Sequence, residues 1–235
     1  MNIKFLNKCV LIKEKSKNIL VLGDLHIGYE ESLNKIGVLV PRMQFKEMVE
    51  ELREIFSDTG RVDEIVLLGD LKHEFGEISK QEWKEVTGIL DLFKKWAKQI
   101  ILIKGNHDTI LGPIAKRKEI EIKEFYVTEG ICFLHGHKMY PECLDKKIKS
   151  IILGHRHPAV VLSDKYKKER YKCFLVGKWK GKKVIILPSF FPFIEGSDII
   201  NVQESKLFIS KKVLNEFEVY VIGKGIYKFD KLKNI

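Results

Sequence analysis

The segment EIVLLGDLKHEFG, residues 64–76, contains the pattern that decides the fold of this chain. It begins with a short apolar run ending in Gly-Asp, as expected for a buried strand with a carboxylate at its end. NILVLGD (18–24) repeats this pattern, and QIILIKGNHD (99–108) is a third apolar run with a polar end. Two segments of helical spacing alternate with these runs, and we predict helices over 44–56 and 81–96. The first two-thirds of the chain is therefore predicted to alternate strands and helices.

After residue 118 helical patterns become scarce. Short apolar runs separated by turn residues indicate strands, namely ICFLHGH (131–137), IILGHRH (151–157), AVVL (159–162), YKCFLVG (171–177) and KKVIILP (182–188). This order predicts an α/β chain with buried sheets and helices packed against them, rather than one purely parallel sheet. Without an internal repeat or a convincing linker, we predict a single domain over residues 1–235.

The composition is that of a soluble globular protein. Hydrophobic residues make up 45% of the 235 residues and charged residues 31%, and no apolar run reaches the roughly 18–20 residues that span a bilayer. Charges occur too early for a signal peptide, so we expect a cytoplasmic protein with no membrane partner. Four cysteines without ligand spacing are expected to be reduced thiols. The net charge of +10 favours polyanionic partners, the alternative being a Lys/Glu-rich surface.

Every histidine lies at or just beyond the end of an apolar run, and the seven are His26, His73, His107, His135, His137, His155 and His157. Strand ends on one side of a sheet converge, so this placement predicts one shared site. DLH and HRH each place two ligand-type residues at i and i+2, and in an extended segment such side chains face the same side. The other candidate ligands are the carboxylate of Asp70, which can bridge two cations, the amide oxygen of Asn106, and His135.

The ordered set D-x-H, G-D, G-N-H-D, H-G, G-H-x-H, from Asp24 to His157, resembles the calcineurin-like metallophosphoesterases. The resemblance implies a four-layer α/β/β/α sandwich with two metals at the C-terminal ends of its strands. It also implies a first metal held by Asp24, His26 and His157, a second held by Asn106, His135 and His155, Asp70 bridging both, and His107 acting on the substrate.

The ligand chemistry agrees with divalent cations. Two such ions carry +4, and Asp24, Asp70 and a bridging hydroxide leave a net charge of about +1, which attracts phosphate. Imidazole and oxygen ligands without thiolate suit Mn²⁺, Fe²⁺ or Zn²⁺ better than Ca²⁺. The resemblance favours Mn²⁺, with Ni²⁺ as a further alternative.

His73 departs from the pattern of the phosphatase-type members, which usually read G-D-x-x-D and pair the second carboxylate with the catalytic histidine. GDLKHE resembles the nuclease subunit of double-strand-break repair complexes. GDLKHEFG resembles compact archaeal and bacterial phosphoesterases, which include enzymes linked to DNA ligase and described as DNA-repair endonucleases. We expect His73 to donate a hydrogen bond to a phosphate oxygen while His107 protonates the leaving alkoxide. The alternative is that His73 merely packs near the site. For His137, an orienting role and simple exposure both stay open.

Residues 165–183 hold nine Lys or Arg against one Glu, interleaved with Tyr166, Tyr171, Phe174 and Trp179. Basic residues with aromatic ones suit a nucleic acid. The candidate substrate-binding residues are Lys178, Lys180, Lys182 and Lys183, and the alternative is a solvated hairpin. Because this segment follows His157 directly, it is close to the site in sequence, which favours a functional role.

The sequence thus predicts a phosphodiesterase, in which a metal-bridging hydroxide attacks the phosphorus of DNA or RNA. One alternative is a small-molecule phosphoesterase acting on cyclic or bis-nucleotides or on monoesters. Another is a non-catalytic scaffold, which the complete ligand set disfavours. Only 78 residues follow His157, so processive duplex resection is not expected.

Overall fold

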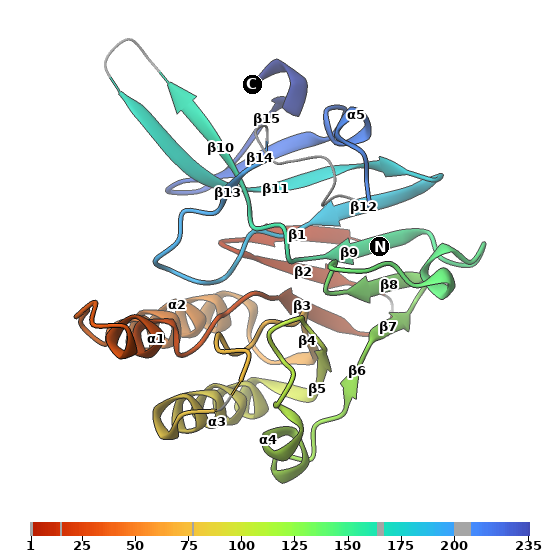
Figure 1. Cartoon of the computed structure of the whole chain (residues 1–235). Helices are drawn as coiled ribbons and strands as arrows, with labels where there is room; N and C mark the ends of the chain where they lie inside the picture. The colour runs from red at the N-terminus through yellow and green to blue at the C-terminus, as the bar shows by residue number, and fades with distance from the viewer. Residues whose placement is uncertain (1, 15, 77, 164–166, 200–207) are drawn as a thin grey trace.

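Two β-sheets stacked face to face form the centre of the computed structural model (Figure 1). The structure describes residues 2–14, 16–76, 78–163, 167–199 and 208–235. Within this part of the chain, none of the helices is both long and apolar enough to cross a membrane.

The first sheet has the order β1-β2-β3-β4-β5-β6. Its strands are β1 (Asn2–Leu6), β2 (Cys9–Lys13), β3 (Asn18–Leu22), β4 (Val62–Leu67), β5 (Ala97–Ile103) and β6 (Ile122–Lys123). Strands β3 to β6 are parallel, so they end at the same edge, whereas β1 and β2 form an antiparallel hairpin beside β3. The sequence analysis had not identified this N-terminal hairpin.

The second sheet has the order β13-β10-β11-β12-β9-β8-β7, with β14 paired to β11 and β15 to β14. Its strands are β7 (Phe125–Thr128), β8 (Ile131–Leu134), β9 (Ser150–Leu153), β10 (Pro158–Ser163), β11 (Lys168–Trp179), β12 (Lys182–Ile186), β13 (Ser197–Asp198), β14 (Glu218–Ile222) and β15 (Ile226–Lys231). β8, β9 and β12 are parallel to one another, and the remaining ladders are mostly antiparallel. The sheet is therefore mixed, as the sequence predicted.

Helices cover the outer face of the first sheet. They are α1 (Tyr29–Lys35), α2 (Gln44–Thr59), α3 (Lys80–Trp96) and α4 (Gly112–Arg117). α2 and α3 confirm the two predicted helices. Ser79 begins α3 with a capping box, in which its hydroxyl accepts from the Glu82 amide while the Glu82 carboxylate accepts from the Ser79 amide. Glu82 also accepts from the amide of Glu74, which ties the start of the helix to the segment that carries His73.

Alternate side chains of the central strands enter different cores. Along β3, Leu20 and Leu22 pack under the helices, whereas Ile19 and Val21 face the second sheet. This follows from the two-residue period of a strand, and burial of both faces explains the continuous apolar run. A third core, on the outer face of the second sheet, is covered by α5 (Lys211–Leu214) and the 3₁₀ turns Pro141–Leu144 and Leu232–Asn234. The α/β/β/α sandwich is confirmed, with its fourth layer built from short turns among the described residues. That the whole chain is one domain stays a prediction.

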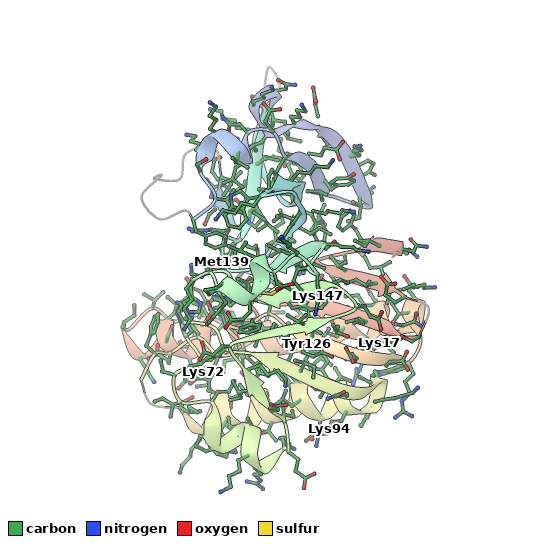
Figure 2. The ribbon with its side chains drawn as sticks, turned by 90° about the vertical axis from the view of Figure 1, so that its right-hand side faces the viewer. Lys17, Lys72, Lys94, Tyr126, Met139 and Lys147 are labelled. Carbon is green, nitrogen blue, oxygen red and sulfur yellow. A yellow bond between two sulfur atoms is a disulfide. The ribbon has the colours of Figure 1, made fainter. Side chains whose placement is uncertain are left out.

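The expectation of four reduced thiols is wrong for one pair. Cys132 on β8 and Cys143 in the 3₁₀ turn Pro141–Leu144 form a disulfide, with their Cα atoms 5.4 Å apart (Figure 2). Cys9 and Cys173 are buried free thiols. The paired cysteines are 11 positions apart in the sequence, so their proximity arises from the fold and not from a recognisable spacing.

Candidate metal centre

The ends of five parallel strands bring the predicted site residues together. Asp24 follows β3, Asp70 follows β4 and Asn106 follows β5, while His135 and His155 follow the parallel pair β8 and β9. Main-chain hydrogen bonds join the loops, including one from the Asp24 amide to the Gly69 carbonyl. The stacked sheets therefore end at one shared edge, as the sequence predicted.

Five of the seven predicted ligands have left-handed backbone conformations. Their φ angles are 55° at Asp24, 46° at His26, 48° at Asp70, 68° at His155 and 45° at His157. The expectation that D-x-H and H-x-H are extended segments is therefore wrong, because the chain turns sharply just after each strand. Such conformations cost of order 1–3 kcal/mol each and concentrate at functional sites.

The first group consists of Asp24, His26 and His157. The Nε2 atoms of His26 and His157 are 3.4 Å apart, and His157 Nε2 lies 3.3 Å from Asp24 Oδ1. Asp24 Oδ1 is buried and has no hydrogen-bond partner among the described residues. Its other oxygen, Oδ2, accepts from the His155 amide at 2.9 Å, so Oδ1 is left to face the two imidazoles. A buried, unpartnered carboxylate oxygen among imidazole nitrogens fits a divalent cation.

The second group consists of Asp70, His135 and His155, with Asn106 beside them. His135 Nε2 lies 3.0 Å from both His155 Nδ1 and Asn106 Oδ1, and 3.4 Å from Asp70 Oδ2. The other ring nitrogen, Nδ1, donates to the carbonyl of Leu68 at 2.7 Å. This bond fixes the ring so that Nε2 points into the group, as in many metal sites.

Asp70 lies between the two groups. Its Oδ2 is 3.4 Å from His135 Nε2 and 3.8 Å from His26 Nε2, while Oδ1 accepts from the His107 amide at 2.9 Å. Nearby glycines allow this approach. A Cβ atom on Gly105 would lie 2.1 Å from Asp70 Oδ1, and one on Gly154 would lie 2.5 Å from Asp24 Oδ2. The G-N and G-H motifs therefore keep room for the two carboxylates.

The protonation states of the imidazoles also suit cations. Burial, followed by His157, lowers the pKa of His26 to about 3, and burial followed by His135 lowers that of His155 to about 4. Both rings are neutral at pH 7, with lone pairs free to bind metal. Burial alone lowers the pKa of His135, but the carboxylates of Asp70 and Asp24 outweigh it and raise the pKa to about 9. The pull that these carboxylates exert on a proton acts equally on a cation.

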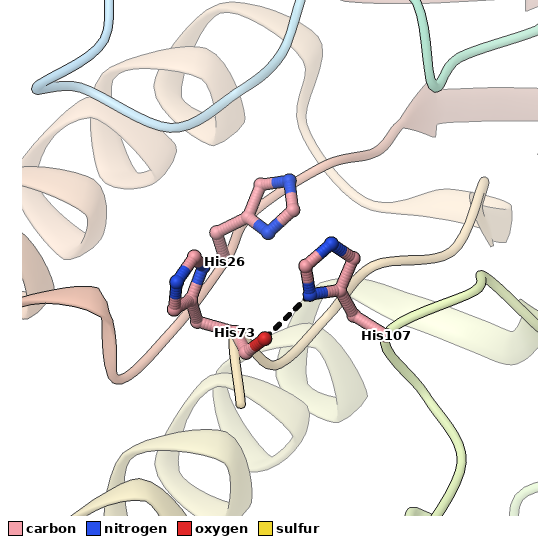
Figure 3. Close-up of side chains that lie close together, drawn as sticks. All are labelled: His26, His73 and His107. Carbon is pink, nitrogen blue, oxygen red and sulfur yellow. Dashed lines mark hydrogen bonds between the residues drawn. The ribbon is translucent and has the colours of Figure 1, made fainter. Parts of the chain in front are cut away.

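His73 and His107 lie beside the first group, and their ring nitrogens cluster with that of His26 (Figure 3). His107 Nδ1 donates a hydrogen bond to the main-chain carbonyl of His73, which directs Nε2 toward Asp70 Oδ2, 3.9 Å away. A backbone carbonyl, and not a side chain, therefore orients His107. The His73 ring has its centre 5.5 Å from that of His107, and its buried Nδ1 has no hydrogen-bond partner in the part of the chain that the structure describes.

Two further polar residues lie close by. The ring of His137 is centred 5.3 Å from that of His135, so it lies next to the second group, and its buried Nδ1 has no partner within the described ranges. Asp108 is buried and accepts from the amides of Leu71 and Gly105 at 3.0 and 2.9 Å. It braces two of the loops that carry the site.

The expected position of Lys178, Lys180, Lys182 and Lys183 near the site is wrong. Lys183 pairs with Ser150 at the start of β9, whereas the metal groups lie beyond the end of β9. These lysines therefore lie at the opposite edge of the sheet, near the β11–β12 turn (Figure 1). Lys182 is also buried, with Nζ donating to two main-chain carbonyls.

The aromatic residues expected in this segment are not a free stacking surface. Phe174 is fully buried in the core between the sheets, and Tyr171 and Trp179 are half-buried against the outer core. Lys165 and Tyr166 lie outside the described residues. Chain proximity to His157 misled the prediction because β11 is long and runs past the site to the far edge.

The sequence analysis missed an aromatic border beside the centre. The ring of Tyr29 lies 4.9 Å from that of His73 and 5.0 Å from that of Phe191, while Phe75 lies 3.8 Å from His107. The motif PSFFPF, at 188–193, carried a signal, because it places three phenylalanines directly after an apolar run.

Comparisons with known proteins agree with this arrangement. The family described as calcineurin-like phosphoesterase matches residues 17–187. No curated protein matches the chain. The crystal structure of Pseudomonas putida nuclease MPE is similar over 97% of this chain and 100% of its own, with 18% identity and a TM-score of 0.63. The E. coli phosphoesterase Yfce is similar over 73% of this chain and 79% of its own, with 18% identity and a TM-score of 0.42.

Proposed function

This chain belongs to the calcineurin-like phosphoesterases, metal-binding hydrolases of phosphoric esters, and we propose that it is a dinuclear phosphodiesterase that cleaves DNA or RNA. The observation that carries this proposal is the pair of ligand groups that meet at Asp70 Oδ2. A carboxylate oxygen within 4 Å of one imidazole nitrogen from each group suits a bridge between two cations. The P. putida protein is a nuclease with this fold, although 18% identity establishes the fold alone.

We assign the first cation to Asp24, His26 and His157, and the second to Asn106, His135 and His155, with Asp70 shared. When bound, the two cations supply Lewis-acid charge and lower the pKa of water toward roughly 7. Mn²⁺ is the proposed metal, because the ligand set is mixed imidazole and oxygen without thiolate. Fe²⁺, Zn²⁺ and Ni²⁺ are the alternatives.

His107 is assigned the role of general acid. Its Nδ1 proton is engaged by the His73 carbonyl, so the proton that it can transfer is the one on Nε2, which faces the centre. The leaving sugar alkoxide of a nucleic acid is a poor leaving group and requires that proton.

His73 supports a diester as the substrate. Burial, followed by His107, lowers the pKa of His73, so the ring is neutral at pH 7 and carries one N–H donor. A neutral N–H can donate to a non-bridging oxygen of the phosphate without adding negative charge beside it, while His107 protonates the leaving alkoxide.

The path of a polyanion is proposed along the β10–β11 hairpin instead of the β11–β12 turn. β10 begins directly after His157, and the hairpin projects from the site end of β11 (Figure 1). Lys168 and Arg170, both exposed on this hairpin, line a cavity of about 520 Å³, whose lining also includes Glu169 and Glu195. Basic side chains on the site side of the sheet suit phosphates flanking the cleaved bond.

The test is a Mn²⁺-loaded substrate panel of single-stranded DNA, duplex DNA, RNA, a chromogenic diester and a chromogenic monoester. The proposal expects cleavage of at least one nucleic acid and preference for the diester over the monoester. Hydrolysis of small esters alone would instead identify a small-molecule phosphoesterase. A role in DNA repair and a cytoplasmic location stay predictions from the sequence.

A further inference from the structure

An apolar pocket lies beside the proposed metal centre, against α1. Its lining includes Tyr29, Leu33, Val40, Met43 and Phe193, and its volume is about 160 Å³. Phe193 and Met43 are 48% and 46% exposed, so the pocket is open to solvent. Cavities for drug-sized ligands are roughly 300–1,000 Å³, so this one suits a single ring system.

A continuous row of rings connects the pocket with the centre. Phe193 contacts Phe191 at 6.2 Å between ring centres, and Phe191 contacts Tyr29 at 5.0 Å and His26 at 6.0 Å. Tyr29 in turn contacts His73 at 4.9 Å. One ring, that of Phe191, thus lies between the pocket and the proposed metal ligand His26. The lining residue Tyr29 contacts His73, the proposed hydrogen-bond donor to the phosphate, directly.

We propose that this pocket binds the base of an unpaired nucleotide next to the cleaved phosphodiester bond. The inference rests on the proposed function and adds a substrate class, unpaired nucleic acid. Aromatic rings beside a phosphate site suit base stacking, and a base can enter the pocket only if it has left its own stack. The net charge of +10 favours the same polyanion over a neutral or basic protein segment.

The pocket offers little for reading base identity. Glu30 lies at its wall, but Glu30 Oε1 already accepts from the amides of Met43 and Gln44 at 2.8 and 3.0 Å. The other lining residues named above present apolar surface or the Tyr29 ring. Recognition therefore depends on the flat face that all bases share, and we expect weak sequence preference but clear preference for single strands over duplex.

The test uses oligonucleotides that carry 2-aminopurine at successive positions, bound to the full chain in EDTA. Stacking quenches the fluorescence of this base, so the signal does not depend on catalysis. Phe193→Leu removes the ring and keeps an apolar side chain. Phe229→Leu is the matched control, because Phe229 is 38% exposed on β15, outside the pocket and the metal groups.

Quenching is expected at one position in the wild type and in Phe229→Leu, and not in Phe193→Leu. The affinity of Phe193→Leu should fall by about 5- to 150-fold, the range for one base–aromatic stack. An oligonucleotide with an abasic residue at that position should bind the wild type and Phe193→Leu with equal affinity.

Three results would overturn the inference. Unchanged quenching in Phe193→Leu, with oligonucleotides still bound and cleaved, contradicts the pocket and leaves the proposed function intact. A change from dimer to monomer in Phe193→Leu, with quenching unchanged, makes the pocket an interface between copies of this chain. A chain that neither binds nor cleaves oligonucleotides contradicts the proposed function and the inference together. Melting temperature and metal content of each variant show that the fold is kept.

Discussion

His73→Asp tests how this site distinguishes diesters from monoesters. The main-chain carbonyl of residue 73, and not its side chain, accepts from His107 Nδ1, so the substitution keeps His107 oriented. It removes an imidazole donor and adds a negative charge beside the phosphate. His73→Asn is the matched control, because asparagine has the size of aspartate but is neutral and carries an N–H donor.

The ring centres of His73 and His107 are 5.5 Å apart, which sets the size of the effect. A unit charge at that distance favours protonation of His107 by about 0.8 kcal/mol in bulk water and about 3 kcal/mol at an effective dielectric of about 20. The acid form then persists to higher pH, so the alkaline limb of the pH–rate profile should move up by about 0.5–2 pH units. The lost donor should lower DNA cleavage by about 10²–10³-fold.

The assay compares kcat/KM for DNA with that for an activated aryl diester, whose leaving group needs little protonation. The ratio should fall at least about tenfold in His73→Asp, a difference of about 1.4 kcal/mol between the two barriers, and less in His73→Asn. Monoester hydrolysis should hold steady or rise. Equal losses of kcat/KM on DNA and on the aryl diester would refute the reasoning. So would alkaline limbs of the pH–rate profile that are identical in His73→Asp and His73→Asn.

The other predictions concern the cations, the acid, the polyanion path and the loop brace. Asp70→Asn should lose activity and bind markedly less metal than the two ions per chain expected for wild type, and elemental analysis that finds at most one ion in saturated wild type contradicts the dinuclear assignment. His107→Ala keeps the backbone amide that holds Asp70, so metal content should persist while turnover falls by about 10²–10⁴-fold; loss of metal would make His107 a ligand. Arg170→Gln should reduce the slope of log affinity for DNA against log salt by about one, whereas Lys178→Gln at the opposite edge should not; equal slopes would reject the β10–β11 path. Asp108→Asn turns an amide group toward backbone N–H donors and should lower the free energy of unfolding by about 1–3 kcal/mol, measured by urea denaturation; unchanged stability would contradict its bracing role.

The sequence by itself determined the strands that lead into the centre, the helices α2 and α3, and the candidate residues at the strand ends. Apolar runs that end in Gly-Asp, Gly-Asn or Gly-His are local signals, because a strand buried on both faces needs continuous apolar residues and the following turn needs a small one. Parallel strands end at one edge, so Asp24, Asp70 and Asn106 had to meet there. The ligand groups required the family resemblance as well, since spacing alone does not divide seven histidines between two cations.

Only the tertiary structure decided the remaining features, because they depend on segments far apart in the chain. The left-handed turns at the ligands, the orientation of His107 by the carbonyl of His73 and the Cys132–Cys143 bond all arise from packing between elements. The lysines after His157 show most directly what a local sequence pattern does not determine. Proximity in sequence suggested proximity to the site, but β11 spans the sheet and carries Lys178 to the opposite edge. Strand length and direction, which a local pattern does not specify, decide where a charge lies.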